Sequence, residues 1–312
     1  MTKQQQDKQD NPKLENFNSN VNGIPFVDIN YDLYKPTQYG GLVYKDIDGE
    51  AVQCERLIKA GQHFILEGEK GLGKTLMVND LCFSMDMRLV AYNCSSATSE
   101  SELLGQTIIT KDGTFAFQLG VLPIGIMCAN KFGKAVVYLD ECNTPNPDVQ
   151  KILNSITDDR RMCIANNHVF KVNEGCQLVV IGTMNPLSYS GVNSLNEDLI
   201  SRFMGKVIKT PQRDVLKSII DWKKVPDENI ESLLTLAEDI RNLRNTGTVD
   251  YSLSTRDMQQ FATLYTLTVA DTTPENALKT ALEMTVSFKM PTEEQRASVN
   301  GAIKDVFGVI LK

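Results

Sequence analysis

Eight consecutive residues combine glycines, a lysine and a hydroxyl at the spacing of a phosphate-binding loop, G-x-x-x-x-G-K-[ST]. They are Gly68, Glu69, Lys70, Gly71, Leu72, Gly73, Lys74 and Thr75. Glycines let successive backbone N–H groups turn toward phosphate oxygens, and a helix N-terminus adds partial positive charge. Lys74 would neutralise β- and γ-phosphate oxygens, and the Thr75 hydroxyl would hold Mg²⁺. We expect residues 68–76, up to Leu76, to bind a nucleoside triphosphate.

The residues on either side of this loop have the pattern that the motif requires. Phe64, Ile65 and Leu66 form an apolar run typical of a short buried strand, and residues 76–85 have the composition of a helix. A glycine-rich turn that binds nothing is the alternative interpretation. The predicted strand–loop–helix order counts against it and favours nucleotide binding.

A second apolar strand, predicted over residues 134–139, ends in two carboxylates, Asp140 and Glu141. Asp140 would hold magnesium through water, and Glu141 would polarise the water that attacks the γ-phosphate. A solvated strand end is the ordinary interpretation of an Asp-Glu pair. Its position 66 residues after Lys74, in the same domain, favours the catalytic one. Because a glutamate base serves hydrolysis, the sequence predicts an ATPase rather than a kinase.

Composition excludes some other classes of protein. The chain has 312 residues, which at about 150 residues per domain predicts two domains. A net charge of −7 and a pI near 5.1 argue against a surface that binds nucleic acid generally. The seven cysteines have no C-x-x-C spacing, and the two histidines belong to no metal-ligand cluster. With neither an apolar signal sequence nor a long apolar run, we expect a soluble, cytoplasmic protein without membrane contact.

Hydrophobic periodicity predicts an α/β fold, a parallel sheet sandwiched by helices, followed by an all-helical C-terminal domain. The expected divisions are a disordered polar tail at 1–22, an N-terminal extension and leading helix at 23–60, the nucleotide-binding domain at 61–212, and the helical domain at 213–312. The expected strands are 63–67, 89–94, 134–140, 177–184 and 205–210.

Two hairpins and three helix caps complete the expected elements. Residues 107–117 alternate about Asp112-Gly113, a strong hairpin signal, and residues 162–172 turn at Asn166-Asn167. In the last hundred residues, Ser254, Thr273 and Thr292 have the pattern of helix N-caps. A nucleotide-binding domain requires neither hairpin, so we expect them to have a separate function.

Three further residues gain significance from their order. Asn185 ends an apolar strand, Arg202 precedes the last strand, and Arg256 lies in the first turn of a helix. Each has an ordinary structural interpretation by itself. In this order, however, the motifs of residues 61–260 resemble those of AAA+ ATPases, specifically the MoxR-like group of the helix-2-insert branch.

Within this group the chain is most similar to the CbbQ/NorQ type, and similar segments occur in CobS, GvpN and midasin-like ATPases. The similarity rests on the sequence Thr-Asp-Asp-Arg-Arg at 157–161 and on a second set of residues after the strand 177–184. That set is Asn185, Pro186, Tyr189, Gly191, Leu195, Leu199, Arg202 and Phe203.

The resemblance implies a role for each residue. Asn185 would be sensor 1, orienting the attacking water; Arg202 would be the arginine finger that reaches a neighbouring subunit's γ-phosphate. Arg256 would be sensor 2, which couples the nucleotide state to a helical lid formed by the C-terminal domain. The two hairpins resemble the helix-2 insert and the presensor-1 hairpin, which face a pore or client, with Phe115 and Phe117 as the aromatic residues of the former. Arg160 and Arg161 have two open interpretations, an intersubunit contact or a solvated helix end.

The resemblance also implies a function. MoxR-like proteins form rings, usually hexamers, and act as remodelling chaperones that mature or activate a client, typically with a von Willebrand factor A-domain partner. One alternative is a nucleic-acid-linked motor or restriction-type subunit, against which the acidic pI counts. Another is a nucleotide-dependent assembly scaffold. The identity of the client is not encoded in any pattern of the chain.

Overall fold

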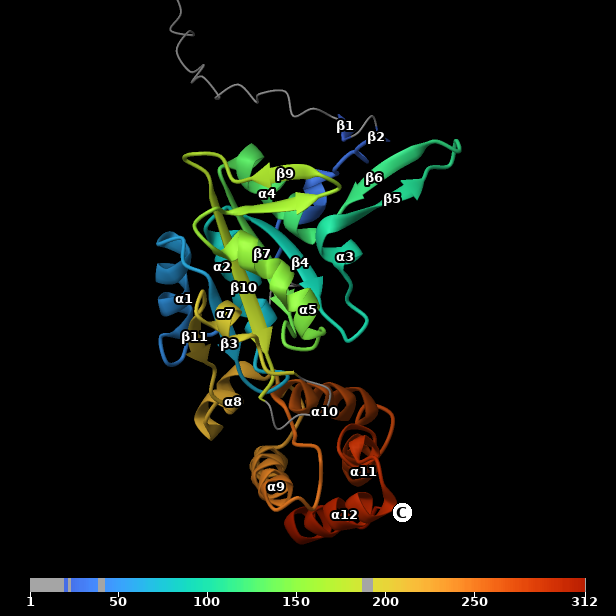
Figure 1. Ribbon diagram of the computed structural model, residues 1–312. Helices are drawn as coiled ribbons and strands as arrows, with labels where there is room; N and C mark the ends of the chain where they lie inside the picture. The colour runs from blue at the N-terminus through green and yellow to red at the C-terminus, as the bar shows by residue number, and fades with distance from the viewer. Residues whose placement is uncertain (1–19, 22–23, 39–42, 187–192, 312) are drawn as a thin grey trace, which may run out of the picture. The chain divides into compact units, whose positions relative to one another are not determined.

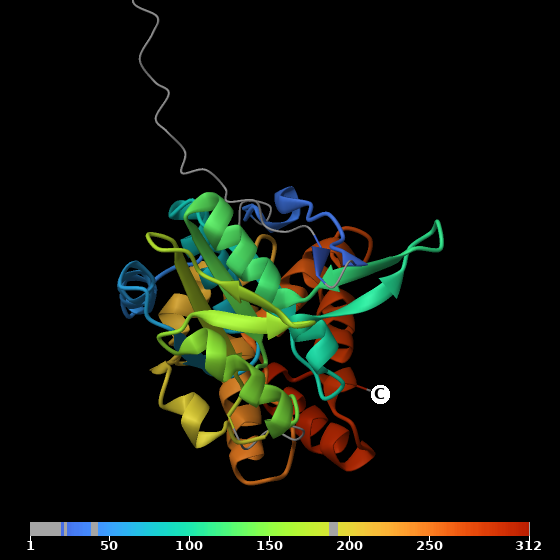
Figure 2. The same cartoon turned by 45° about the horizontal axis from the view of Figure 1, so that its top comes forward.

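The computed structural model describes residues 20–21, 24–38, 43–186 and 193–311 (Figures 1 and 2). Nearly all of the expected polar tail, along with Tyr189 and Gly191, lies outside the described residues. The chain divides into two compact units. The first comprises residues up to 43, residues 51–66 and residues 75–206; the second comprises residues 44–50, 67–74 and 207–312. The phosphate-binding loop therefore groups with the second unit, and Thr75 with the first.

Between residues 64 and 207 the strands of the sheet are separated by helices, as the apolar runs predict, with two hairpins inserted between them. The strands are β1 Asn20–Val21, β2 Ile24–Pro25, β3 Phe64–Glu67, β4 Arg88–Asn93, β5 Gly105–Ile109, β6 Phe115–Leu119, β7 Lys134–Asp140, β8 Met162–Ala165, β9 His168–Lys171, β10 Gln177–Met184 and β11 Met204–Val207. The helices are η1 Tyr31–Tyr34, α1 Glu50–Lys59, α2 Lys74–Ser84, α3 Glu100–Leu104, α4 Val121–Phe132, α5 Pro147–Gln150, η2 Lys151–Leu153, α6 Asn154–Thr157 and α7 Glu197–Ile200.

Five strands form one sheet in the order β11-β3-β10-β7-β4. Strand β7 pairs in parallel with both β10 and β4, which places it among buried neighbours and explains its continuous apolar run. Parallel strands end at the same edge, so Asp140 and the residues after β10 are brought together there. The expected α/β fold is confirmed, and the last strand ends at Val207 rather than at residue 210.

Helix α4 covers one face of this sheet at short range. A Cβ atom on Gly125 of α4 would lie 2.2 Å from Val137 Cγ2, so only glycine permits this approach. Val137 and Leu139 belong to the same buried core as α4. Because side chains alternate along a strand, Tyr138 and Asp140 are directed toward the opposite face. This alternation places the polar residues of β7 on the side where the site is built.

The two predicted hairpins form as separate antiparallel pairs, β5 with β6 and β8 with β9. The β5–β6 hairpin projects from the sheet in both views (Figures 1 and 2). Its aromatic residues differ: Phe115 is exposed, whereas Phe117 is buried and its ring contacts Phe26. Of the two aromatic residues, only Phe115 is exposed to a partner, because an N-terminal segment pairs with this strand at Phe26 and covers Phe117.

Between residues 208 and 311 the regular elements of the second unit are all helices. They are α8 Arg213–Ile219, α9 Asp227–Asn245, α10 Thr255–Thr268, α11 Pro274–Thr285, η3 Ser287–Lys289 and α12 Glu293–Phe307. Helices α10 and α11 pack together, as do α9 and α12, around a buried apolar core (Figure 1). Ser254, Thr273 and Thr292 each cap a helix, and Ser254 forms the full capping box with Asp257. The helical C-terminal region is thus confirmed.

Candidate functional site

The predicted phosphate-binding loop connects β3 to the first turn of α2, as expected. Gly71 and Gly73 both have φ of +79°, a left-handed conformation that favours glycine. Lys74 is buried, and its ammonium donates hydrogen bonds to the carbonyl oxygens of Gly68, at 2.7 Å, and Glu69, at 2.8 Å. The loop therefore wraps around a positive charge, an arrangement that fits the polyphosphate of a nucleotide.

The second compact unit supplies neighbours to this loop. Gly71 lies so close to Ser254 that an added Cβ atom would meet the Ser254 Cβ at 2.7 Å. Arg244 of α9 forms an ion pair with Glu69 at 3.0 Å, a contact that the sequence did not indicate. Arg256 lies in the first turn of α10, where we expected it, and its side chain is exposed. Leu72 is buried, whereas Lys70 is exposed.

In the first unit, polar side chains gather at the end of β7; we call them the carboxylate cluster. Its members are Thr75, Tyr138, Asp140, Glu141, Thr183 and Asn185. Asp140 Oδ1 accepts hydrogen bonds from the Tyr138 hydroxyl, at 3.1 Å, and from the Thr183 hydroxyl. Thr75 Oγ1 lies 3.5 Å from the other oxygen, Asp140 Oδ2. The two residues predicted to hold a metal are therefore neighbours.

The other predicted catalytic residues of this unit complete the cluster. Glu141 has φ of +54°, so the chain turns sharply after the strand, and its N–H donates to Thr183 Oγ1 at 3.0 Å. Asn185 is buried and its Nδ2 donates to Glu141 Oε1 at 3.3 Å. Asn143 in turn donates to the Asn185 carbonyl oxygen at 3.2 Å. The structure thus brings Glu141 and Asn185 together, as their proposed roles require.

Burial governs the titration of this region. Burial, followed by the charge of Asp140, raises the pKa of Tyr138 well above its usual value, so its hydroxyl keeps its proton. Burial raises the pKa of the Cys94 thiol to about 12 and raises that of Cys142 as well. These two thiols remain protonated at neutral pH, consistent with buried apolar side chains rather than nucleophiles.

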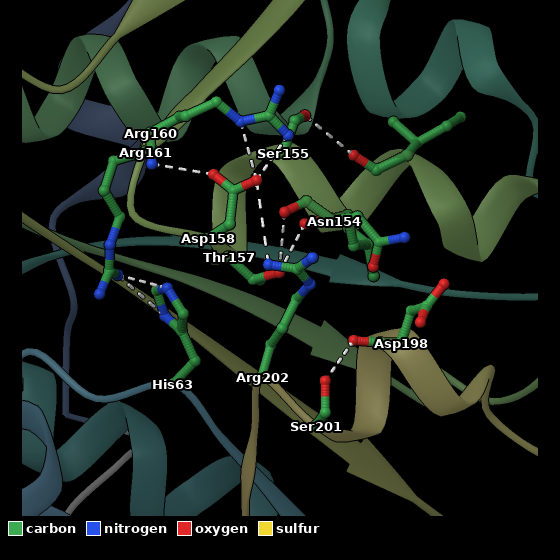
Figure 3. Close-up of polar contacts among 12 residues, drawn as sticks. His63, Asn154, Ser155, Thr157, Asp158, Arg160, Arg161, Asp198, Ser201 and Arg202 are labelled. Atoms are coloured by element: carbon green, nitrogen blue, oxygen red, sulfur yellow. Dashed lines mark hydrogen bonds and ion pairs between the residues drawn. The ribbon is translucent and has the colours of Figure 1, made fainter.

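Arg202 belongs to a second group, which we call the arginine cluster: His63, Asp158, Arg160, Arg161 and Arg202 (Figure 3). Arg160 donates hydrogen bonds to the Asp158 carboxylate, one from its backbone N–H and one from Nε, each at 2.9 Å. Arg202 Nη1 lies 3.9 Å from the same carboxylate. The Arg202 side chain is 32% exposed, and its Nε has no hydrogen-bond partner among the described residues.

Arg161 faces a different direction from Arg160 (Figure 3). Its guanidinium contacts the His63 ring and donates to the carbonyl oxygens of Leu178 and Gly61, each at 3.2 Å. Burial, together with the charge of Arg161, lowers the pKa of His63 to about 3. These bonds connect the segment before β3 to β10 within one chain. They correspond neither to an intersubunit contact nor to a solvated helix end, the two interpretations that the sequence left open for Arg161.

Comparison with known proteins places these motifs in a family. Residues 63–203 match the AAA domain of the dynein-related subfamily, and residues 217–306 match the CbbQ/NirQ/NorQ C-terminal region. The first match spans both the arginine cluster and the carboxylate cluster, and the second spans most of the helical region. The chain is an AAA+ ATPase of the CbbQ/NirQ/NorQ type.

This AAA+ ATPase is also similar to curated proteins of unassigned function. It is 26% identical over 268 residues to an uncharacterized protein of Staphylococcus epidermidis, covering 84% of this chain and 97% of that protein. It is 24% identical over 266 residues to one from Staphylococcus aureus, with the same two coverages. A solved structure of a candidate ATPase from Cytophaga hutchinsonii has 19% identity and a TM-score of 0.46, covering 86% of this chain and 91% of that one.

Two residues of the AAA+ ATPase that contact the carboxylate pair were absent from the sequence prediction. They are Tyr138, two positions before Asp140 on β7, and Thr183, on the adjacent strand β10. The spacing of two residues is a signal that was available, because it puts Tyr138 and Asp140 on one face of the strand. The same spacing relates Thr183 to Asn185, which follows directly after β10. Among the described residues, no helix has the length and apolar character needed to cross a bilayer.

Proposed function

We propose that this AAA+ ATPase binds ATP with Mg²⁺ and hydrolyses it by the residues of the phosphate-binding loop and the carboxylate cluster. The observation that carries the proposal is the contact between Glu141 and Asn185, beside an Asp140 carboxylate that faces Thr75. A hydrolytic site needs a base near an amide that orients water, and a metal ligand pair next to both. These four side chains supply those groups.

Each residue has one task in this proposal. Lys74 neutralises β- and γ-phosphate oxygens, while Thr75 and Asp140 would hold Mg²⁺, which would neutralise charge that develops on the phosphates. Glu141 accepts a proton from the attacking water, and the Asn185 amide orients that water. Two further residues act on this site: Arg202 as a finger toward the neighbouring subunit and Arg256 as the residue that responds to the nucleotide state.

The biological role that we propose is that of a MoxR-type remodelling chaperone. The chain would assemble into a ring. A monomer would lack a complete site, because Arg202 would complete the site of a neighbouring subunit. The ring, by family resemblance a hexamer, would mature or activate a client protein together with a von Willebrand factor A-domain partner. Partial exposure of the Arg202 side chain, which is 32% exposed, supports a contact outside the chain.

The hydrolytic proposal is tested by comparing Glu141→Gln with Lys74→Ala. Glu141→Gln keeps the size of the side chain but removes the base, so we expect unchanged affinity for ATP and magnesium and a loss of about 10²–10⁴-fold in turnover. Lys74→Ala should weaken binding itself. Binding is measured by equilibrium fluorescence titration and turnover by phosphate release. Wild-type hydrolysis by Glu141→Gln would refute the assignment of the base.

The assembly proposal has its own measurement. Light scattering at micromolar protein should show a ring in the presence of ATP, and a monomer under those conditions would contradict it. A von Willebrand factor A-domain protein encoded beside this chain should bind the ring and change its rate of hydrolysis. If it does neither, the chaperone role loses its expected partner while the ATPase assignment stands.

A further inference from the structure

Tyr138 is a polar side chain in β7, a strand of the sheet whose interior positions are all buried. It is 2% exposed, and its neighbours Val137 and Leu139 are apolar core residues on the other face. A buried hydroxyl without partners is costly, so a strand that needed only bulk at this position would be better served by an apolar residue. The Tyr138 hydroxyl makes hydrogen bonds with Thr75 and Asp140, and both of these are predicted metal ligands.

The geometry defines the direction of these hydrogen bonds. The Tyr138 hydroxyl donates its only proton to Asp140 Oδ1 at 3.1 Å. Its 3.0 Å contact with Thr75 Oγ1 then has Thr75 as the donor, so the single Thr75 hydroxyl proton points to Tyr138 rather than to Asp140 Oδ2, which lies 3.5 Å away. The bonds therefore run from Thr75 through Tyr138 to Asp140. This direction leaves a lone pair of Thr75 Oγ1 available to a cation, and it occupies the oxygen of Asp140 that lies away from Thr75.

The remaining oxygen of Asp140 is distinguished by what surrounds it. Oδ1 accepts from both Tyr138 and Thr183, whereas Oδ2 lies 3.5 Å from Thr75 Oγ1. Two donors on one oxygen fix the rotation of the carboxylate and direct the other oxygen toward Thr75. Groups that hydrogen-bond a metal ligand in this way hold it in place and affect metal affinity.

We propose that Tyr138 is a positioning residue for the divalent cation that accompanies the nucleotide, acting through Thr75 and Asp140. The proposal rests on the proposed function, because it assumes that these two residues serve a metal–nucleotide complex. Tyr138 itself does not contact the reacting atoms. Its contribution is to hold two ligands from different elements, α2 and β7, at one orientation before the cation binds.

The test is Tyr138→Phe, which retains the ring and its packing and removes only the hydroxyl. The matched control is Tyr92→Phe, the same change on the adjacent strand β4, where the hydroxyl lies 3.5 Å from Thr98 Oγ1. For each protein, binding of a fluorescent, slowly hydrolysed ATP analogue is titrated at increasing Mg²⁺ and again in EDTA. Thermal unfolding of all three proteins shows whether the fold is retained.

We expect Tyr138→Phe to need about 10-fold more Mg²⁺ for half-maximal metal-dependent binding, the lower end of effects at such positions. Its affinity for the analogue in EDTA should equal that of the wild type, and Tyr92→Phe should match the wild type in both conditions. An unchanged Mg²⁺ requirement in Tyr138→Phe overturns the inference. So does an equal loss with and without Mg²⁺, which would place the effect on the nucleotide rather than the metal.

Failure of the proposed function gives a different result. In that case the wild-type protein itself would bind no ATP analogue, or would bind it independently of Mg²⁺. The inference about Tyr138 alone fails when the wild type shows Mg²⁺-dependent binding and Tyr138→Phe shows the same dependence.

Discussion

The carboxylate cluster and the arginine cluster belong to the same compact unit, yet their polar groups are paired to different degrees. In the carboxylate cluster, buried Tyr138, Thr183 and Asn185 each bond to Asp140 or Glu141. In the arginine cluster, Arg202 is one-third exposed and reaches Asp158 only at 3.9 Å. A preorganised set of buried bonds suits chemistry within one chain, whereas a loosely held, partly exposed side chain suits a contact with another molecule.

Two adjacent arginines of the arginine cluster, Arg160 and Arg161, also differ in their partners. Arg161 donates to backbone carbonyl oxygens of two segments, while the adjacent Arg160 is exposed and bonds to Asp158. Sequence position therefore does not decide the role of an arginine; the direction of its side chain does. The predictions below test this division, beginning with the largest expected effect.

Arg202→Ala should bind nucleotide normally and lose about 10³-fold in turnover, the low end of effects for arginine fingers. Its thermal stability should change little, because a long and partly exposed ion pair contributes little. Mixing Arg202→Ala with Glu141→Gln subunits should restore some activity, since interfaces with an intact finger and an intact glutamate reappear. Phosphate release from the mixtures measures this. Absence of any recovery would count against a site shared between subunits.

Arg161→Ala should lower the free energy of unfolding by about 1–3 kcal/mol, because carbonyl groups of Leu178 and Gly61 lose a charged donor. The adjacent Arg160→Ala serves as the control, and its denaturation midpoint should equal that of the wild type, since Arg160 is exposed. Urea unfolding compares the three proteins. Equal midpoints for both variants would remove the distinction between these arginines.

The free energy of unfolding should also decrease as the pH is lowered, because His63 titrates differently in the folded and unfolded chains. In the folded chain its pKa is about 3, below the usual 6.5, so as pH falls below 6.5 the unfolded chain takes up a proton that the folded chain does not. The contribution of His63 to the free energy of unfolding has its full value above pH 6.5. It decreases by up to about 1.4 kcal/mol per pH unit toward pH 3. His63→Asn keeps an acceptor for the Val180 N–H and should flatten that slope. Urea unfolding at several pH values from 7 to 4 gives the free energy of unfolding of both proteins. The same pH dependence in the wild type and in His63→Asn would contradict the assignment.

The smallest effect on hydrolysis is expected from the β5–β6 hairpin, which belongs to neither cluster. Replacing residues 109–115 by a tight turn removes exposed Ile109 and Phe115 but keeps buried Phe117. Basal ATPase activity and stability should therefore be retained, while stimulation by a partner or client should be lost if the hairpin contacts it. Basal and stimulated hydrolysis are compared in the shortened variant and the wild type. Equal stimulation in both would leave the hairpin without a coupling role.

Most of the fold was predictable because its signals are local. The strands β3, β4, β7 and β10 lie within one residue of the predicted bounds, since each is an apolar run that ends in polar residues or glycine. The Asp112-Gly113 turn and the cap at Ser254 were equally local. The last strand was overextended because the apolar residue Ile208 continues the pattern after Val207, where the strand ends.

The sequence by itself determined the chemistry available to this protein: a phosphate-binding loop, two carboxylates after a strand, and an asparagine after the neighbouring strand. Spacing along the chain suffices there, because parallel strands bring their carboxyl ends to one edge. Only the tertiary structure decided which side chains surround these groups. Thr183 meets Asp140 from another strand, Arg244 meets Glu69 across 175 positions, and Arg161 turns toward His63 rather than solvent. Such partners depend on packing between distant segments, which no local pattern encodes.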